Sequence, residues 1–215
     1  MNTWELQSII HKAVKENLHA GMTELELADV ITRVCPDWQG DLISGERTAD
    51  IEGAPTQRVI NYGDVVLLDL QVCSENKWSD LTRVYFVGEI TKEYKAAYKQ
   101  VMNAISAGEA NLCPNKKGRD LWEIMHNAIG SQYAFMHHAG HRIGQFPEEE
   151  IVAEPRFVPE CEEVLKPGMV VTLEPAVYYP GKFGIRLENN YMITEDGYER
   201  LCNLPLDENE YIVKG

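Results

Sequence analysis

The sequence predicts an α+β fold in which helices pack on one face of an antiparallel sheet, in two similar halves. Two observations carry this prediction. Segments with apolar residues at helical spacing open each half of the chain, and apolar runs of strand length follow them in both halves. No linker rich in proline, glycine or serine separates the halves. We therefore expect residues 1–215 to form a single domain.

The first half has the clearer boundary signals. A helix is expected where apolar residues recur between residues 6 and 14, with Gly21 as its terminator. Thr23 and Glu26 form a capping-box pattern that begins a second helix, which ends near residue 34. The remaining predicted elements of this half are strands over 65–72 and 83–87 and a helix over 94–105 capped by Thr91.

The second half repeats this order in outline. A helix is expected near residues 120–129, and strands are expected near residues 133–137, 169–173 and 184–194. Helices that precede strands twice in succession favour two halves of similar design rather than an alternating βαβ chain.

The composition is that of an ordinary globular protein, with 44% hydrophobic and 25% charged residues. The net charge of −14 argues against nucleic acid or an anionic membrane as a partner. The longest apolar runs are strand-sized, and the opening residues MNTWELQSII lack the features of a signal peptide, which favours the cytoplasm. Five cysteines without a C-x-x-C pair fit reduced thiols rather than a disulfide or zinc framework.

Two acidic residues are expected to face each other across the first hairpin. If residues 73–76 form the turn, Asp69 lies opposite Asp80, with Cβ atoms roughly 4.5–5.5 Å apart. Two ionised carboxylates at this distance repel, and burial makes their charged forms costlier. The alternative is that each is a cap or a solvated residue, which is the commoner situation for a lone aspartate beside a strand.

A second pair of acids is expected near the C-terminus. A turn centred on residues 180–182, which read Pro-Gly-Lys, places Glu174 opposite Glu188. Pro175 must bend or end the ladder beside Glu174, because proline cannot donate a ladder hydrogen bond. Two hairpins thus each offer a facing pair of carboxylates.

Cations held between these acids would balance their charge more completely than Arg83 or Arg186 could. Hard oxygen ligands with one or two imidazoles suit a pair of divalent ions roughly 3.5–4 Å apart. The segment FMHHAGHRIG supplies candidate imidazoles from His137, His138 and His141. The other histidines lie in helical patterns and are expected at surface or boundary positions: His11, His19 and His126.

These segments, in this order, resemble the pita-bread metallopeptidases, which include methionine aminopeptidase, aminopeptidase P, prolidase and creatinase. The resemblance covers nearly the whole chain, from GMTELELA through GDVVLLDL, WSDLTRVYFVG and MHHAGHRIG to KPGMVVTLEP and GIRLENNYMITEDG. It implies a pita-bread fold, with a curved antiparallel sheet, helices on one face and two pseudo-symmetric halves. The stretches SDLTR and TLEPAVYYPGKFGIRLEN are similar to the prolidase and aminopeptidase P branch.

The resemblance also implies a dinuclear metal site. Asp69 would chelate the first ion, Asp80 and Glu188 would bridge both ions, and His141 and Glu174 would complete the second. A metal-bridging hydroxide would attack the scissile bond, and Glu174 would handle the proton of that water. Manganese suits this oxygen-rich ligation, with cobalt, zinc and iron as alternatives.

The substrate contacts depart from the family pattern. His137 matches a histidine that contacts substrate in this branch, and Arg186 is expected beside the substrate as well. Two auxiliary histidines of the family are replaced here, by Glu52, 17 residues before the first metal aspartate, and by Glu148, seven residues after His141. An ionised glutamate cannot donate a hydrogen bond. We therefore expect either weak cleavage of Xaa-Pro peptides or another substrate, such as a cationic one, unless both glutamates are solvated loop residues.

Three functions remain open at this point. The first is an exopeptidase of Xaa-Pro dipeptidase or aminopeptidase type that acts on short peptides. The second is a C–N hydrolase of small amino-acid derivatives on the same fold. The third is a non-catalytic peptide-binding module, which would be expected to lose ligands that this chain keeps. Prolidase-type chains also carry an N-terminal domain that is missing before the first helix here, so we expect an open cleft, a different oligomer such as a homodimer, or a partner chain.

Overall fold

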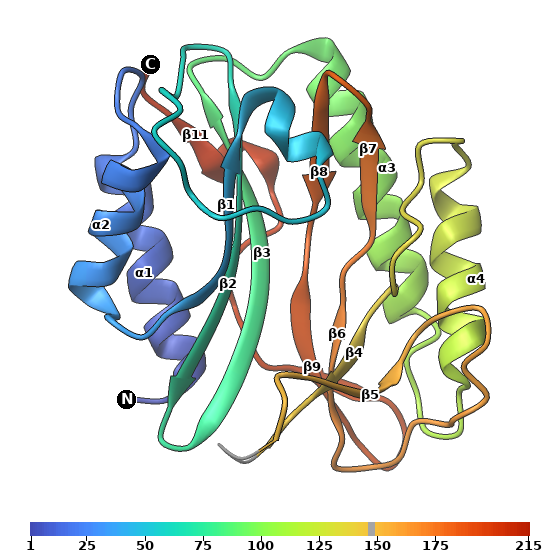
Figure 1. Cartoon of the computed structure of the whole chain (residues 1–215). Coiled ribbons are helices and arrows are strands. Elements are labelled where there is room, and N and C mark those ends of the chain that lie inside the picture. The colour runs from blue at the N-terminus through green and yellow to red at the C-terminus, as the bar shows by residue number, and fades with distance from the viewer. Residues whose placement is uncertain (146–148) are drawn as a thin grey trace.

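The computed structural model describes residues 1–145 and 149–215, which form four α-helices, two short 3-10 helices and eleven strands (Figure 1). In the first half the elements are α1 (Thr3–Asn17), α2 (Glu24–Val34), β1 (Gln39–Ser44), η1 (Gly45–Ala49), β2 (Val65–Ser74) and β3 (Lys77–Val87). In the second half they are α3 (Lys92–Glu109), α4 (Gly118–Ile129), β4 (His141–Ile143), β5 (Val152–Arg156), β6 (Val170–Leu173), β7 (Ala176–Tyr179), β8 (Phe183–Arg186), β9 (Asn189–Ile193), β10 (Tyr198–Arg200), η2 (Glu208–Tyr211) and β11 (Ile212–Val213).

The predicted helix caps are confirmed. The Thr23 hydroxyl accepts a hydrogen bond from the backbone N–H of Glu26, and the Glu26 carboxylate accepts one from the backbone N–H of Thr23. The Thr91 hydroxyl caps α3 by accepting a hydrogen bond from the backbone N–H of Tyr94. The predicted terminator of the first helix is wrong, because α1 ends at Asn17. Gly21 instead serves the turn before α2, where its φ of +96° is one that glycine adopts without strain.

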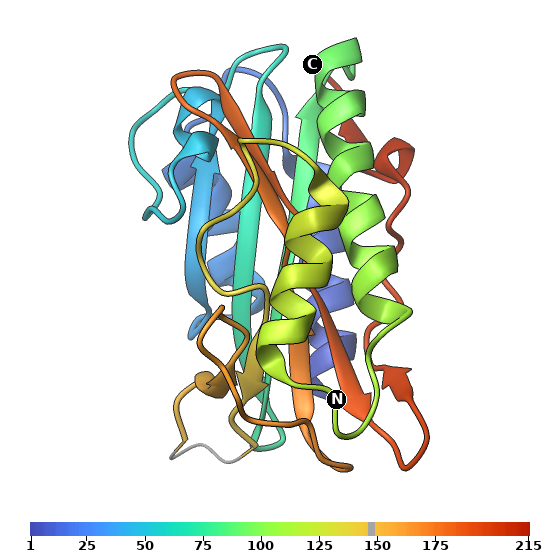
Figure 2. The same cartoon turned by 90° about the vertical axis from the view of Figure 1, so that its right-hand side faces the viewer.

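Three hydrogen-bonded sheets contain the strands. One has the order β1-β2-β3-β11, a second has the order β10-β9-β6-β4-β5, and β7 pairs with β8. These pairs are antiparallel except for β11, which runs parallel to β3. In Figure 1 the strands lie between the α1/α2 pair and the α3/α4 pair. Figure 2 shows α3 and α4 side by side in front of the strands of the second half.

Alternation along the strands separates a helix-facing side from a site-facing side. In β2, Val66, Leu68 and Leu70 are fully buried in one hydrophobic cluster with residues of α1 and α2. Leu67 belongs to the other cluster, which contains residues of α3 and α4. Because side chains alternate along a strand, Asp69 shares the Leu67 side and points away from α1 and α2. Helices α1 and α2 therefore leave this side of the sheet to the acidic residues and to the cluster that contains α3 and α4.

The hairpin of the second half breaks in its middle, as predicted from Pro175. The β6/β9 ladder ends with Leu173 opposite Asn189, and the β7/β8 ladder begins with Ala176 opposite Arg186. Both ladders share one register, so the break does not shift the pairing. It frees residues 174–175 and 187–188 from the regular ladder. The side chains of the two glutamates at this break can therefore turn toward a common centre.

Two strand predictions are wrong. The strand expected near residues 133–137 does not form, and its one ladder contact is an isolated bridge between Ala134 and Val177. Its backbone groups bond to separate segments instead, as in the bond from Phe135 N–H to the Ala176 carbonyl. The single strand expected over 184–194 is divided into β8 and β9. None of the helices among the described residues is both long and apolar enough to cross a membrane.

Candidate metal centre

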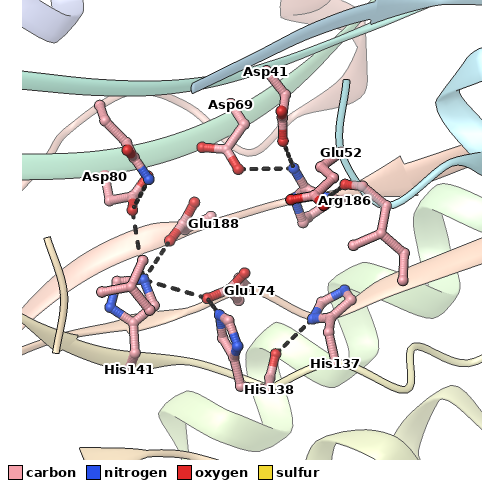
Figure 3. A pocket seen from close by; sticks show the side chains of 13 residues that line it. Asp41, Glu52, Asp69, Asp80, His137, His138, His141, Glu174, Arg186 and Glu188 are labelled. Atoms are coloured by element: carbon pink, nitrogen blue, oxygen red, sulfur yellow. Dashed lines mark hydrogen bonds and ion pairs between the residues drawn. The ribbon is translucent and has the colours of Figure 1, made fainter. Parts of the chain in front are cut away.

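A cavity of about 160 Å³ lies where the site-facing sides of the two halves meet (Figure 3). Its wall is dominated by charged and titratable side chains. The acidic residues are Asp41, Glu52, Asp69, Asp80, Glu174 and Glu188, and the basic or imidazole residues are His137, His138, His141 and Arg186. Segments separated by more than a hundred residues in the sequence thus contribute to one site.

The register predicted for the first hairpin is wrong, although the predicted face is right. The turn has only two central residues, Glu75 and Asn76, and both have positive φ (52° and 59°), which is typical of a tight hairpin turn. Asp69 therefore lies opposite Thr82, two residues beyond the predicted partner Asp80. A slip of two residues preserves the face because side chains repeat with a period of two. The two aspartates are diagonal neighbours on the cavity side.

The register predicted for the second hairpin is confirmed in both paired segments. Tyr179 lies opposite Phe183 and Leu173 lies opposite Asn189, which is the pairing that the Pro-Gly turn implies. Glu174 and Glu188 stand across from each other at the break between these ladders. Both side chains are buried, with relative exposures of 7% and 1%.

His141 lies at the centre of the acidic residues. Its Nε2 atom is 3.5 Å from Asp80 Oδ2, 3.6 Å from Glu174 Oε1 and 3.9 Å from Glu188 Oε1. Its Nδ1 atom is 2.9 Å from the Arg142 carbonyl oxygen, which can only accept a hydrogen bond. The Nδ1–H group therefore donates to Arg142, and the Nε2 atom faces the carboxylates.

The carboxylates are short of hydrogen-bond donors. Asp69 Oδ1, Asp80 Oδ1 and Glu188 Oε1 are buried without a hydrogen-bond partner. Burial raises the pKa of Asp80 well above its ordinary value, and the charges of Asp69 and Glu174 raise it further. Burial also raises the pKa of Glu188, with Asp80 as the next contributor. Unsatisfied buried oxygens around an imidazole lone pair are the donor set that a divalent cation prefers.

Among the residues that the structure describes, two groups of side chains offer donor atoms close enough together to hold a cation. In one group, Asp80, His141 and Glu188 each offer an atom, and in the other His138, His141 and Glu174 do so. Within each group these atoms lie within 4.8 Å of one another. The residues present therefore fit cations chemically, and His141 belongs to both groups.

Arg186 neutralises part of this charge, whereas Arg83 does not. The Arg186 Nη2 atom donates to Asp69 Oδ2 at 2.7 Å and to Asp41 Oδ2 at 3.3 Å. Its Nη1 atom donates to the Ile51 carbonyl and to the Tyr178 hydroxyl, and its Nε atom donates to the Thr82 hydroxyl. All five N–H donors of this guanidinium thus have protein acceptors. Arg83 lies on the other face of β3, where it donates to the Tyr211 hydroxyl and to nearby carbonyls.

His137 is held by protein partners at both ring nitrogens. Its Nδ1 atom is 2.7 Å from the His138 carbonyl oxygen, and its Nε2 atom is 3.0 Å from the Tyr178 hydroxyl. Burial lowers the pKa of His137 to about 4, so the ring is neutral near pH 7. Glu52 is exposed and lines the cavity, as expected for a residue at its mouth. Glu148 lies outside the described residues.

The resemblance to the family assigned no role to three residues that the structure places here. His138 Nε2 lies 3.1 Å from Glu174 Oε1. Asp41 lies opposite Asp69 in the β1/β2 ladder, and Tyr178 joins His137 to Arg186. The histidine pair in HHAGH was a usable signal for His138, whereas nothing in the polar segment QGDLIS indicated a strand that reaches the site. His11, expected near the surface, is 3% exposed, because it packs against Tyr85 beneath α1.

Comparison with known proteins gives consistent results. The chain matches the model of metallopeptidase family M24 over residues 3–195. It is 32% identical over 165 residues to the uncharacterized peptidase YqhT of Bacillus subtilis, covering 75% of this chain and 46% of that protein. It is 31% identical over 166 residues to the Xaa-Pro dipeptidase of Pyrococcus horikoshii, covering 77% of this chain and 47% of that protein. The chain thus spans about half the length of these curated relatives.

Solved structures show the same relationship. The X-Pro aminopeptidase from Thermotoga maritima superposes with a TM-score of 0.88 at 27% identity, covering 99% of this chain and 61% of that chain. The prolidase from Pyrococcus furiosus superposes with a TM-score of 0.87 at 29% identity, covering 94% of this chain and 61% of that chain. These similarities confirm the predicted pita-bread fold. With a family model that spans both halves and a site-bearing fold shared with these enzymes, the chain belongs to metallopeptidase family M24.

Proposed function

We propose that residues 1–215 form a catalytic domain that acts as a dinuclear metal-dependent hydrolase, an exopeptidase of Xaa-Pro dipeptidase or aminopeptidase type. One observation carries the proposal. Oxygens of Asp80, Glu174 and Glu188 converge on the Nε2 atom of His141, at 3.5, 3.6 and 3.9 Å, in a buried pocket with unsatisfied carboxylate oxygens. A peptide-binding module without catalysis would not need to keep such costly groups together.

Four of the five carried-over ligand positions belong to the two groups of candidate donors, and Asp69 lines the same cavity. We assign Asp69, Asp80 and Glu188 to one cation, with Asp80 and Glu188 shared, and His141 with Glu174 to the other. Four carboxylates balance the charge of two divalent ions. Manganese is our first choice for the oxygen-rich part of the site, with cobalt, zinc and iron as the alternatives to test. When bound, two such cations supply an activated water and polarise the scissile carbonyl.

Glu174 is the residue that we assign to proton transfer. Burial would raise its pKa, but the imidazoles of His138 and His141 outweigh that effect and lower the pKa to about 2. The carboxylate is therefore ionised at neutral pH and can accept a proton from the attacking water. The Thr172 hydroxyl donates to Glu174 Oε1 at 3.2 Å and helps to hold the carboxylate in place.

Arg186 and His137 line the substrate side of the site. We assign them to substrate binding mainly because they position two other side chains, those of Asp69 and Tyr178. Arg186 orients Asp69, because it donates to Oδ2 of that residue and leaves Oδ1 without a partner. His137 accepts from the Tyr178 hydroxyl and so sets the direction of a phenol at the cavity wall. A substrate would meet this rigid His137–Tyr178–Arg186 chain rather than free side chains.

The acidic mouth favours a second candidate function. Glu52 lines the cavity where the family has a histidine, and Asp41 lies on the wall beside it. Two carboxylates at this position would attract a substrate with an amine or guanidinium group. A C–N hydrolase of small cationic amino-acid derivatives is therefore the alternative to an Xaa-Pro exopeptidase. Five free thiols are consistent with a cytoplasmic location for either enzyme.

The test combines metal analysis with a substrate panel. Metal-free protein would be loaded with Mn²⁺ and assayed on Xaa-Pro dipeptides, Met-peptides, and N-acyl and guanidino amino acids. We expect two ions per chain, and we expect Glu174→Gln to lower kcat by a factor on the order of 100 or more. Glu160→Gln, on the exposed surface, is the matched control. Full metal loading without peptide cleavage would favour the second candidate, and a chain that binds no metal would leave only a binding module.

A further inference from the structure

We propose that His138 is a sixth protein ligand of the metal centre, on the same cation as His141 and Glu174, and that it biases this position toward nitrogen-preferring metals. The inference rests on the proposed function, because it requires cations in the cavity. It goes beyond the five ligand positions that the resemblance to the family implies. It also makes the two metal positions chemically unlike.

The distances fit coordination of one ion by these three residues. His138 Nε2 is 3.1 Å from Glu174 Oε1, and His141 Nε2 is 3.6 Å from the same oxygen. The candidate donor atoms of the three residues all lie within 4.8 Å of one another. Two ligands that each sit about 2.1 Å from one ion in tetrahedral geometry are about 3.4 Å apart. The observed spacings are close to those edges without any movement of the backbone.

The backbone around His138 holds the imidazole in this place. The Ala139 N–H donates to the Phe157 carbonyl at 2.8 Å, and the Glu174 N–H donates to the Ala139 carbonyl at 2.9 Å. The second bond ties the residue after His138 directly to the residue that shares the proposed ion. The His138 carbonyl also accepts from His137 Nδ1 at 2.7 Å. A ligand whose backbone is held by hydrogen bonds loses little conformational entropy when it binds a metal, and this is the condition for a preorganised site.

The two imidazole rings approach Glu174 from different directions. Their planes are nearly perpendicular, at 86°, with ring centroids 5.4 Å apart (Figure 3). Rings in this arrangement can point their Nε2 lone pairs at one ion without clashing. The pair geometry therefore permits a shared ligand set.

The resulting donor sets differ between the two positions. Asp69, Asp80 and Glu188 offer only oxygen, which suits Mn²⁺. The other position combines the nitrogens of His138 and His141 with oxygens of Glu174 and of the shared Asp80 and Glu188, a set that suits Zn²⁺ or Co²⁺ better than the all-oxygen set does. We therefore infer two unequal affinities, with the nitrogen-rich position selecting Zn²⁺ or Co²⁺ over Mn²⁺.

Calorimetric titration of the metal-free full chain tests this with the metals themselves. His138→Ala is expected to weaken one of two Co²⁺ or Zn²⁺ binding steps by about 10- to 100-fold or more, and to weaken Mn²⁺ binding less. The matched control is His19→Ala, which removes an exposed imidazole that does not line the cavity. That variant is expected to bind both ions with wild-type affinity. The visible absorption of bound Co²⁺ should change in His138→Ala and not in the control.

His138→Gln, which keeps the side chain at a similar size, guards against a trivial folding defect. Both His138 variants must melt near the wild-type temperature in the presence of a chelator, and Gln must not restore the Co²⁺ affinity. Two unaltered Co²⁺ binding steps and an unaltered Co²⁺ spectrum in both His138 variants would overturn the inference and leave the proposed function intact. A wild-type chain that binds neither Co²⁺ nor Mn²⁺ would overturn both.

Discussion

Glu188→Gln is expected to stabilise the metal-free protein while it weakens metal binding. Glu188 is 1% exposed, and one of its carboxylate oxygens has no hydrogen-bond partner. The other oxygen accepts from the Thr82 hydroxyl at 2.9 Å, a bond that a glutamine carbonyl can also accept. The substitution thus removes a charge and keeps the shape and the one polar contact. Without cations, the charge of Glu188 destabilises the folded protein.

The size of the effect follows from the spacing of the acids. Donor atoms of Glu188 and Asp80 lie within 4.8 Å. At an effective dielectric constant of about 20, two charges at that distance repel by roughly 3–4 kcal/mol. Partial protonation relieves some of this repulsion. We therefore expect Glu188→Gln to raise the free energy of unfolding of the metal-free protein by about 1–3 kcal/mol near pH 7.

The effect has a definite pH dependence. Burial raises the pKa of Glu188 in the folded protein above its ordinary value of 4.5, so ionisation is costlier in the folded state than in the unfolded chain. Below about pH 4.5 both states hold the proton, and the penalty vanishes. As the pH rises through the folded pKa, the penalty appears. The advantage of the glutamine variant should therefore be small at pH 5 and larger at pH 8.

Denaturant unfolding with a chelator, and again with Mn²⁺, is the assay. With Mn²⁺ at 100 times its Kd the wild-type protein gains about 2.7 kcal/mol and the variant gains less, so the stability advantage of the variant should shrink. Glu160→Gln on the exposed surface is the control and should leave both values unchanged. A metal-free variant no more stable than wild type at pH 8 would refute the reasoning. It would mean that repulsion between the acids does not lower the free energy of unfolding of the metal-free protein.

Three further predictions concern stability and the cavity rim. Glu24→Gln should lower the free energy of unfolding by about 2–3 kcal/mol in chemical denaturation and raise KM. The buried Glu24 carboxylate holds the loop that carries Glu52, through Arg47 and through the Thr56 N–H at 2.9 Å. An unchanged KM would show that this loop does not contribute to substrate binding. Asn76→Gly should raise the free energy of unfolding, measured by denaturant unfolding, by about 0.5–1 kcal/mol, because Asn76 has a φ of 59° in the tight turn. Burial, and then the charge of Arg83, lowers the pKa of His11 from 6.5 to about 3, so stability should fall as the pH drops below 6.5, by about 2 kcal/mol at pH 5. This loss of stability below pH 6.5 should be absent when the free energy of unfolding of His11→Gln is measured as a function of pH.

Features decided by short-range chemistry could be predicted from the sequence. The capping box of Thr23 and Glu26 closes within one helical turn, so it requires nothing from the rest of the chain. The Pro-Gly turn sets the pairing of its flanking strands in the same local way. The face on which Asp69 and Asp80 lie was also predictable, although the register was not. Strand side chains repeat every two residues, so an error of two residues in the turn leaves the face unchanged.

Other features depend on contacts between distant segments, and only the tertiary structure decided them. Asp41 reaches the site because β1 pairs with β2, yet its strand has a polar sequence with no periodic signal. His138 and Arg186 could point in several directions from their own backbones. Their positions are selected by Glu174 and by Asp69, partners 36 and 117 residues away along the chain (174 − 138 and 186 − 69). A side chain can adopt several staggered rotamers, and its neighbours in the sequence do not indicate which distant partner will select one. The sequence therefore determined the donors of this centre, whereas packing of the two halves decided which of them meet.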